Sequence, residues 1–206
     1  METKTKIKKM RIKSLHHLLA KGAAEYANNP LFCFERKGVD YSVTYSEFYD
    51  YVKAIARGLI CSDLGGKRVA VIGETSVEWI GAYLGTVISG GEIVPLDALL
   101  DRDQLINFIN LAECDVFFYS DSWASAIEEN IEKMPTVKHF GRLTDASFSH
   151  RTSGKKPLEK LCRLSDVVKN GNANRSVAIP DTDTQKIFLR SIMTLLYLQT
   201  LWGTRV

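Results

Sequence analysis

The four histidines are the most obvious candidates for acid–base chemistry, because a histidine titrates near neutral pH. They are His16, His17, His139 and His150. None has a serine, cysteine or aspartate partner that the spacing identifies, and the chain contains no G-x-S-x-G elbow. His16 and His17 lie in an expected helix, where a surface or half-buried role is the default. The histidines therefore predict no nucleophilic catalysis.

Two segments have residue types that could hold a phosphate, although neither G-x-x-x-x-G-K-[ST] nor G-x-G-x-x-G is present. Gly73 follows an apolar segment, at a place where doubly wound sheets bind ligands. The neighbouring Glu74 would repel phosphate, so we interpret Gly73 as a turn residue. Thr152-Ser153-Gly154-Lys155-Lys156 combines hydroxyls, a glycine and cations. No buried strand precedes it and no second glycine completes an anion nest, so a solvated loop is the better interpretation.

The carboxylates that stand out also have structural explanations. Glu78 opens an expected helix, where a negative charge is favourable, and the adjacent Trp79 is expected to pack. Glu128 and Glu129 share a helix with Lys133, which indicates a solvated face. We therefore predict no catalytic, cofactor-binding or metal-binding residue in this chain.

The cysteines are isolated from one another. Cys33, Cys61, Cys114 and Cys162 form no C-x-x-C pair and have no histidine at ligand spacing. Zinc binding and a disulfide framework are both disfavoured, and the pattern fits a reducing cytoplasm.

Charge is concentrated at the start of the chain. The 206 residues carry a net charge of +3, but residues 1–13 hold six basic residues against Glu2 alone, a balance of +5. The remainder sums to −2, which leaves no basic face for nucleic acid. The next segment, Ser14–Tyr26, is amphipathic and therefore no signal peptide or membrane span. We expect residues 1–13 to be a disordered, solvated segment that makes at most weak contact with a membrane surface.

The first hundred residues contain helix and hairpin signals before the main pattern begins. Ser14 can cap a helix that ends near Asn28, and a hairpin is expected from Leu31–Glu35 and Tyr41–Thr44, with a turn at 37–40. Thr44 and Glu47 match a capping box. The helix that they open is expected to bury four side chains at helical spacing: Phe48, Val52, Ile55 and Leu59.

Strands and helices then alternate. Strands are expected at Arg68–Ile72, Glu92–Pro95, Val116–Tyr119 and Lys138–Phe140. Helices are expected at Val77–Ser89, with Val77, Ile80, Leu84 and Val87 on one side, at Asp101–Ala112 and at Ser122–Lys133. Runs such as VAVI and VFFY are apolar on both faces, as parallel strands covered by helices require. The fold class is therefore α/β, an open and mainly parallel sheet flanked by helices.

The pattern weakens after Gly141. Thr144–Pro157 is expected to be a loop, Leu158–Lys169 a helix, and residues 170–174 (NGNAN) a helix breaker. Ile187–Trp202 is densely apolar, but it contains Arg190 and is short for a membrane span.

Several of these segments, in this order, resemble motifs of the adenylate-forming (AMP-binding) superfamily, specifically its fatty acyl-CoA synthetases. Val43–Phe48 (VTYSEF) resembles the first core motif, and Ser89–Asp97 (SGGEIVPLD) resembles the second. Val69–Leu84 (VAVIGETSVEWIGAYL) is similar to the segment of the family that contains a Glu-Trp pair. The resemblance covers about residues 14–140 and continues to Ile179-Pro180-Asp181.

The resemblance implies the N-terminal subdomain of an acyl-CoA synthetase-like fold, and an AMP-forming reaction of fatty acid, ATP and CoA that uses Mg²⁺. The family's S-G-T-T-G-x-P-K-G phosphate loop is missing after residue 184. We therefore expect residues 14–184 to be a partial ligase domain, incomplete and inactive alone, with no cofactor of its own. Residues 185–206 are expected to be an atypical apolar tail of a truncated or out-of-frame product.

Two alternatives remain at this point. The chain could be a non-catalytic binding module related to the ligases, such as an interaction subunit. It could also be a small complete α/β protein of other function, in which residues 185–206 close the core.

Overall fold

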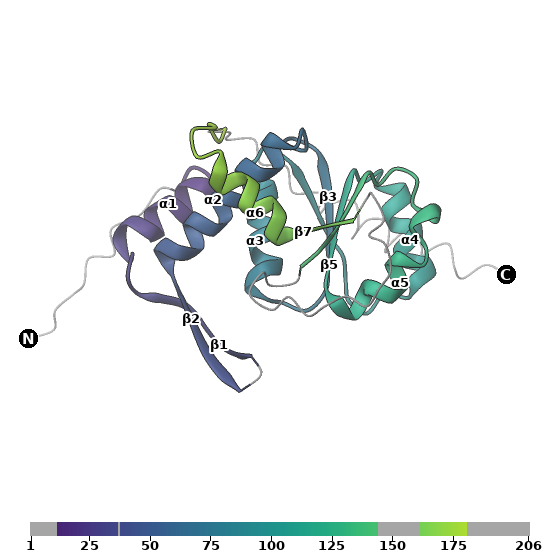
Figure 1. Ribbon diagram of the computed structural model, residues 1–206, viewed down its shortest axis with the longest axis horizontal. Helices are drawn as coiled ribbons and strands as arrows, with labels where there is room; N and C mark the ends of the chain where they lie inside the picture. The colour runs from purple at the N-terminus through teal and green to yellow at the C-terminus, as the bar shows by residue number, and fades with distance from the viewer. Residues whose placement is uncertain (1–11, 37, 144–160, 181–206) are drawn as a thin grey trace, which may run out of the picture.

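A parallel five-stranded sheet forms the centre of the molecule in a computed structural model that describes residues 12–36, 38–143 and 161–180. The strand order is β4-β3-β5-β6-β7, and every neighbouring pair is parallel (Figure 1). The strands are β3 (Arg68–Ile72), β4 (Glu92–Pro95), β5 (Val116–Tyr119), β6 (His139–Arg142) and β7 (Leu161–Arg163). This confirms the predicted fold class and the parallel pairing of the three strongest strands.

Helices cover both faces of the sheet, which explains why its central strands are apolar throughout. On one face, α4 (Arg102–Leu111) and α5 (Ala124–Glu128) pack over inward side chains such as Ile72 and Phe117. On the other, α2 (Tyr45–Cys61), α3 (Val77–Ile88) and α6 (Leu164–Ala173) cover Val71 and Phe118. The two clusters together form the core of a three-layer α/β arrangement.

Side-chain caps fix where the helices begin. Thr44 accepts a hydrogen bond from the Glu47 amide, and the Glu47 carboxylate accepts one from the Thr44 amide, as the sequence predicted. Asp101 and Gln104 form a second capping box at α4. In α2 and α4, N–H groups of the first turn are therefore satisfied by local sequence.

A hairpin projects from the body beside α1 (Leu15–Glu25) (Figure 1). It consists of β1 (Pro30–Arg36) and β2 (Val39–Thr44), paired antiparallel, and Gly38 at its turn has a φ of 74°. Arg36 forms two hydrogen bonds to Glu78 of α3, at 2.9 and 3.1 Å, and Glu78 is 8% exposed. This bidentate ion pair holds the hairpin to the body.

Glycines allow α2 to lie unusually close to its neighbours. A Cβ on Gly85 of α3 would lie 2.4 Å from Ile55, and a Cβ on Gly171 of α6 would lie 1.8 Å from the Ala54 carbonyl oxygen. A side chain at either position would need the helices to move apart, so glycine is required there by packing.

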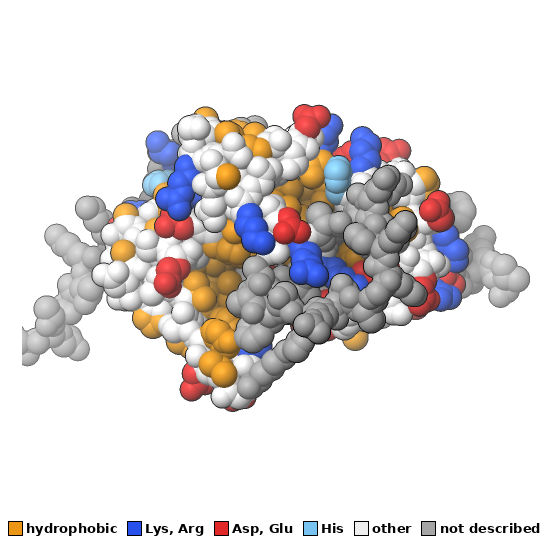
Figure 2. Space-filling view, in the orientation of Figure 1, with side chains coloured by type: hydrophobic (Ala, Val, Ile, Leu, Met, Phe, Trp, Pro, Cys, Tyr) orange, Lys and Arg blue, Asp and Glu red, His pale blue; other side chains and the backbone are white. Residues whose placement is uncertain are grey.

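A third apolar cluster, between the hairpin and helices α1, α2 and α3, is only half covered. Phe48, Val52, Ala56 and Ile88 are buried in it. The predicted inward side of α3 contributes Val77, Ile80 and Leu84, which are only partly buried there, whereas Val87 is buried among the strands. Figure 2 shows apolar side chains gathered on this face and charges of both signs scattered around them.

Three predictions for the later elements are wrong. The single helix expected from Ser122 to Lys133 is instead η1 (Asp121–Trp123), α5 and η2 (Ile131–Lys133). The helix expected over Leu158–Lys169 is β7 followed by α6. The expected breaker at 170–174 is helical as far as Ala173, because Gly171 allows α6 to approach α2. The predictions for residues 1–11, 144–157 and 185–206 lie outside the described residues.

Candidate functional site

The carboxyl ends of β3, β5 and β6 meet at one edge of the sheet, where parallel α/β folds bind ligands. Gly73 follows β3 with a φ of 139°, which is strained for any residue with a side chain. A Cβ at this position would also lie 2.6 Å from Ser120, which follows β5. Gly73 is therefore needed both for the turn and for the close approach of the two loops.

A short hydrogen-bonded chain joins these loops. Ser120 Oγ lies 2.7 Å from Ser122 Oγ, and the Ser122 hydroxyl donates to Glu74 Oε1 at 2.7 Å. These contacts lower the pKa of Glu74, chiefly through the hydrogen bond from Ser122. Glu74 is therefore an ionised, structurally bound carboxylate at the position where a phosphate would otherwise be expected.

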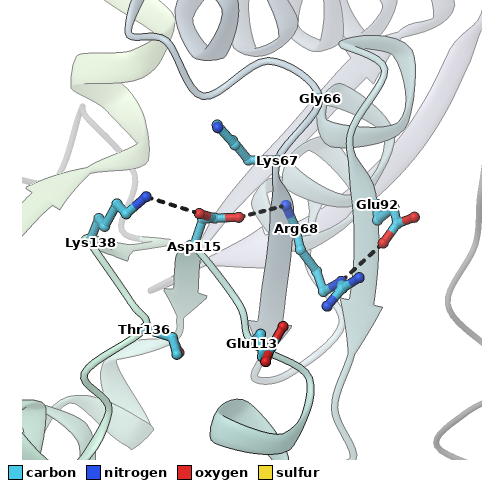
Figure 3. A pocket seen from close by; sticks show the side chains of 8 residues that line it. All are labelled: Gly66, Lys67, Arg68, Glu92, Glu113, Asp115, Thr136 and Lys138. Atoms are coloured by element: carbon cyan, nitrogen blue, oxygen red, sulfur yellow. Dashed lines mark hydrogen bonds and ion pairs between the residues drawn. The ribbon is translucent and has the colours of Figure 1, made fainter.

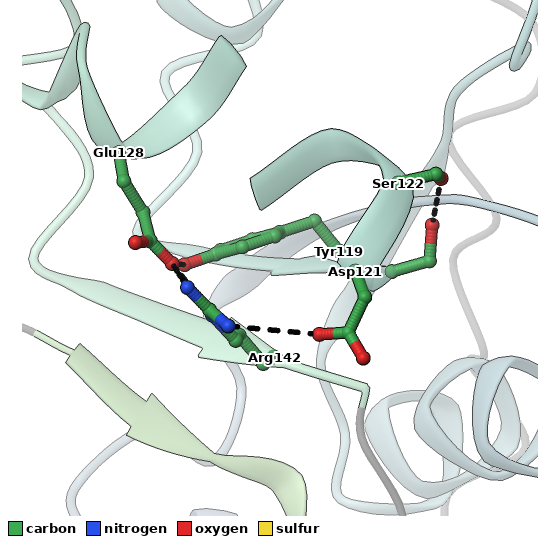
Figure 4. A network of polar contacts seen from close by, with 6 residues as sticks. Tyr119, Asp121, Ser122, Glu128 and Arg142 are labelled. Atoms are coloured by element: carbon green, nitrogen blue, oxygen red, sulfur yellow. Dashed lines mark hydrogen bonds and ion pairs between the residues drawn. The ribbon is translucent and has the colours of Figure 1, made fainter. Parts of the chain in front are cut away.

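Arg142, at the end of β6, connects β5 to α5. Its Nε donates to Glu128 Oε1 at 2.6 Å, and its Nη1 lies 3.7 Å from Asp121 Oδ1. The Tyr119 hydroxyl donates to the same Glu128 oxygen at 2.9 Å. Figure 4 shows the Tyr119 and Arg142 side chains meeting at the Glu128 carboxylate, while Asp121 contacts Arg142 from the other side. The guanidinium thus has two carboxylate partners and little charge left for an anionic ligand.

The electrostatics of this network favour positioning over proton transfer. Burial raises the pKa of Tyr119, and the neighbouring Glu128 carboxylate raises it further. The phenol therefore stays protonated at neutral pH and acts as a hydrogen-bond donor. Burial alone lowers the pKa of Arg142, but Glu128 outweighs that effect and raises it. The raised pKa values of Tyr119 and Arg142 suit hydrogen-bond donors and not groups that exchange protons near pH 7.

A hollow of about 590 Å³ lies at the opposite, amino edge of the sheet (Figure 3). Arg68 Nε lies 2.9 Å from Glu92 Oε2, and Lys138 Nζ lies 3.4 Å from Asp115 Oδ1. Arg68 also donates to the carbonyl of Ala112, which is the C-cap of α4. These cations thus pair with carboxylates or with the negative end of a helix.

The remaining residues that line this hollow carry charges of both signs. Lys67 and Glu113 add one cation and one anion, beside Gly66 and Thr136. Ligands of parallel α/β sheets bind at the other edge. We therefore interpret the hollow as a set of structural ion pairs around the strand starts.

The three histidines among the described residues have different surroundings. His16 Nε2 lies 3.0 Å from the Tyr49 hydroxyl, while His17 lies beside the helix start and accepts from the amide of Lys13. His139 begins β6 at the amino edge. His150 and the segment 152–156 lie outside the described residues.

Metal and disulfide chemistry find no support in the described ranges. Cys33 and Cys61 are exposed and Cys114 is buried, all three as free thiols. Burial raises the pKa of Cys114 to about 12, so this thiol is unreactive at neutral pH. Within residues 12–36, 38–143 and 161–180, no group of three His, Cys, Asp or Glu side chains could hold a metal.

Glu128 joins Tyr119 to Arg142, a role that the sequence pattern did not predict. Its expected solvated position is wrong, because its carboxylate is held by Tyr119 and Arg142, whereas the neighbouring Glu129 is exposed as predicted. The expected packing of Trp79 is confirmed, since it is partly buried and stacks on Tyr83. One signal was available: a tyrosine that ends a wholly apolar strand must place its hydroxyl at the sheet edge beside a partner.

No helix in the described part of the chain is long and apolar enough to cross a membrane. The overall arrangement is that of adenylation domains. The adenylation and carrier-protein didomain of carboxylic acid reductase from Segniliparus rugosus, solved with AMP, superposes with a TM-score of 0.68 at 17% identity. That match covers 87% of this chain and 30% of the reductase chain.

Two relatives found by sequence are ligases. A long-chain-fatty-acid–CoA ligase (ACSBG2) of Rattus norvegicus is 28% identical over 153 residues, or 72% of this chain. A D-alanine–D-alanyl carrier protein ligase of Bacillus velezensis is 24% identical over 115 residues, or 55% of this chain. The chain spans 21% of the first relative and 23% of the second.

The model of the AMP-binding enzyme family matches residues 19–184, which include the hairpin, the whole sheet and the carboxyl-edge network. That range contains the capping box of α2, the buried Glu78 beside Trp79, and β4. These three features lie at the motifs that the sequence resemblance named. This chain therefore belongs to the AMP-binding enzyme family.

Proposed function

We propose that this chain supplies the N-terminal part of an ATP-dependent, AMP-forming ligase that joins a fatty acid to CoA in the cytoplasm. The observation that carries the proposal is the family match over residues 19–184, combined with the similarity to a long-chain-fatty-acid–CoA ligase. In this proposal, residues 14–184 form the partial ligase domain and residues 1–13 and 185–206 flank it.

The contribution of this chain is structural. Tyr119 is held as a neutral donor, Arg142 is paired with carboxylates, and Glu74 is bound by Ser122. Adenylation requires backbone N–H groups, a cation and Mg²⁺ around a triphosphate while a carboxylate attacks phosphorus. We assign none of these roles to a residue of this chain. The scaffold instead fixes the carboxyl edge of the sheet.

Pyrophosphate release tests the proposal. The purified chain, given ATP, Mg²⁺ and a fatty acid, is expected to release no more pyrophosphate than a control without protein. A chimera tests the positive part: residues 14–184 replace the matched segment of the rat ligase. The chimera is expected to release pyrophosphate with a fatty acid and not with D-alanine, and the rat ligase without that segment serves as control.

Fatty-acid-dependent release by the chain alone would contradict the scaffold role. A folded chimera that uses D-alanine in preference to a fatty acid would contradict the proposed substrate class. A cooperative thermal melt of the chimera shows that the result does not come from misfolding.

A further inference from the structure

Helix α3 has no polar outward side. Its sequence, VEWIGAYLGTVI, contains one charged residue, Glu78, which is 8% exposed and paired with Arg36 of the hairpin. Helix α4, on the other face of the sheet, has an exposed polar side with Arg102, Asp103 and Gln104. A surface helix normally has such a side, whereas a helix that is apolar all round lies inside a larger protein. The composition of α3 is therefore that of an interior helix.

Two sides of α3 pack against the body. A Cβ on Gly81 would lie 2.4 Å from Tyr51 of α2, so the two helices are in contact there. Ala82 and Val87 are buried on the side toward the sheet. The third side belongs to the third cluster, in which three residues of α3 are only partly buried: Val77, Ile80 and Leu84. The described part of the chain thus covers this side of α3 incompletely.

The hairpin extends this apolar side. Phe32 and Val43 are register partners and are partly buried members of the same cluster. Cys33 and Ser42, the next pair along the strands, are exposed, because side chains alternate between the two faces of a hairpin. One face of the hairpin and one side of α3 thus form a single apolar surface. We call it the α3–hairpin face, and it consists of Leu31, Phe32, Val43, Val77, Ile80 and Leu84.

Two observations indicate which polypeptide covers this face. Ile179, one residue before the end of the described range 161–180, belongs to the same cluster, so the chain passes the face there. The family match ends at residue 184, and this chain spans 30% of the reductase chain and 21% of the rat ligase. Arg36 and Glu78, which join the hairpin to α3, neutralise one another. The face therefore suits an uncharged, apolar element from the part of these enzymes that the chain does not match.

We propose that the α3–hairpin face binds the remaining polypeptide of an AMP-binding ligase, as an interface between two parts of one enzyme. The inference rests on the proposed function, in which this chain is the N-terminal part. Binding removes apolar side chains such as Phe32 and Ile80 from water, which is the main source of affinity at an apolar contact. Such a contact needs no peptide bond between the two parts, so the full chain is expected to bind the remainder in trans.

Co-purification with the full chain tests the interface. The chain is co-expressed with an affinity-tagged rat ligase from which the matched segment has been deleted. The Segniliparus rugosus adenylation domain, deleted in the same way, is a second recipient. We expect the tagged remainder to retain the chain in a one-to-one ratio. Retention by neither recipient would overturn the proposal.

Charged variants locate the interface. Ile80→Lys and Phe32→Lys are expected to keep a cooperative melt, because a lysine at a partly buried position of the free chain can extend its ammonium into water. In the complex the same ammonium is buried without a partner, so retention is expected to weaken about a hundredfold. Leu111→Lys is the matched control, since Leu111 is 58% exposed on α4, across the sheet, and it should bind like the parent.

Two results with these variants would contradict the proposal. An equal loss of retention in the Leu111 variant would place the contact elsewhere. Loss of the cooperative melt in both the Ile80 and the Phe32 variants would make the face part of the core of this chain. Self-association that Ile80→Lys abolishes, without retention by either recipient, would assign the face to a second copy of the chain and also overturn the proposal.

Pyrophosphate release distinguishes this inference from the proposed function. A retained chain whose complex releases no pyrophosphate with a fatty acid would contradict the proposed function and support the interface. An active covalent chimera, with no retention in trans, would support the function and overturn the interface.

Discussion

Neighbouring residues of the same type have different roles at the carboxyl edge. Glu128 ends α5 and Glu129 is its C-cap, but the first carboxylate accepts from Tyr119 and Arg142 while the second accepts from Ser125. The sequence could not separate them, because their partners are set by strands that are distant in the chain. Parallel strand register brings those partners together, and register is a property of the whole sheet.

The pKa of Glu74 provides a test at the residue scale. Ser122→Ala removes the main cause of its lowered pKa, so the pKa is expected to rise toward its ordinary value of 4.5. A carboxylate with a lowered pKa stabilises the fold above its unfolded pKa, and this contribution is lost as the pH falls through the folded value. The variant should therefore lose less stability than the parent between about pH 5 and 3.

Carboxyl-carbon NMR titration measures the pKa of Glu74 directly. Ser125→Ala is the matched control, because the Ser125 hydroxyl donates to Glu129 and not to Glu74. An unchanged pKa in the Ser122 variant would show that Glu74 is stabilised by its own backbone instead.

At the scale of elements, the strongly patterned segments were predictable and the closely packed ones were not. The strands β3, β4 and β5 were predicted with their observed bounds. Short apolar runs between helices are typical of parallel strands that helices cover on both faces. The segment 170–174 was assigned as a breaker from its Asn and Gly content. In the structure, a Cβ on Gly171 would lie 1.8 Å from the Ala54 carbonyl oxygen, so only glycine fits and tertiary packing overrides local preference.

Gly171→Ala is the prediction for this helix contact. Alanine would improve helix propensity by about 1 kcal/mol, but its Cβ would collide with the backbone of α2. The collision is with backbone and cannot relax by a rotamer change, so a net loss of about 2–3 kcal/mol in the free energy of unfolding is expected.

Urea denaturation measures this loss. Asn172→Ala is the control, since Asn172 is exposed in the same helix and gains propensity without a clash. A Gly171 variant as stable as the Asn172 variant would mean that α6 does not pack on α2 as described.

At the scale of the whole molecule, the sheet is well covered and the face beside the hairpin is not. The third cluster contains four buried side chains and nine that are only partly buried, whereas the two clusters on the sheet are mostly buried. Ile179, close to the last described residue, is one of its partly buried members. The described residues thus form a buried core on the sheet, and the third cluster is an apolar face that could accept further protein.

Deletion of residues 185–206 tests whether the described fold is self-sufficient. Among the described residues the last helix ends at Ala173, and the family match ends at residue 184, so the deleted chain is expected to keep its circular dichroism spectrum and its cooperative melt. The deleted segment contains Ile187, Phe188, Leu189, Ile192, Leu195, Leu196, Leu198 and Trp202. Each such side chain gains about 1.5–3 kcal/mol on leaving water, so the full chain should associate more readily and the deleted chain should give a higher yield in the clarified lysate.

Deletion of residues 1–11 is the control for the effect of truncation itself, and it should change neither the melt nor the yield. If the C-terminal deletion instead abolishes the cooperative melt, residues 185–206 are part of the core. The half-covered cluster would then be the face where they are needed, and the alternative of a small α/β protein of other function would be favoured.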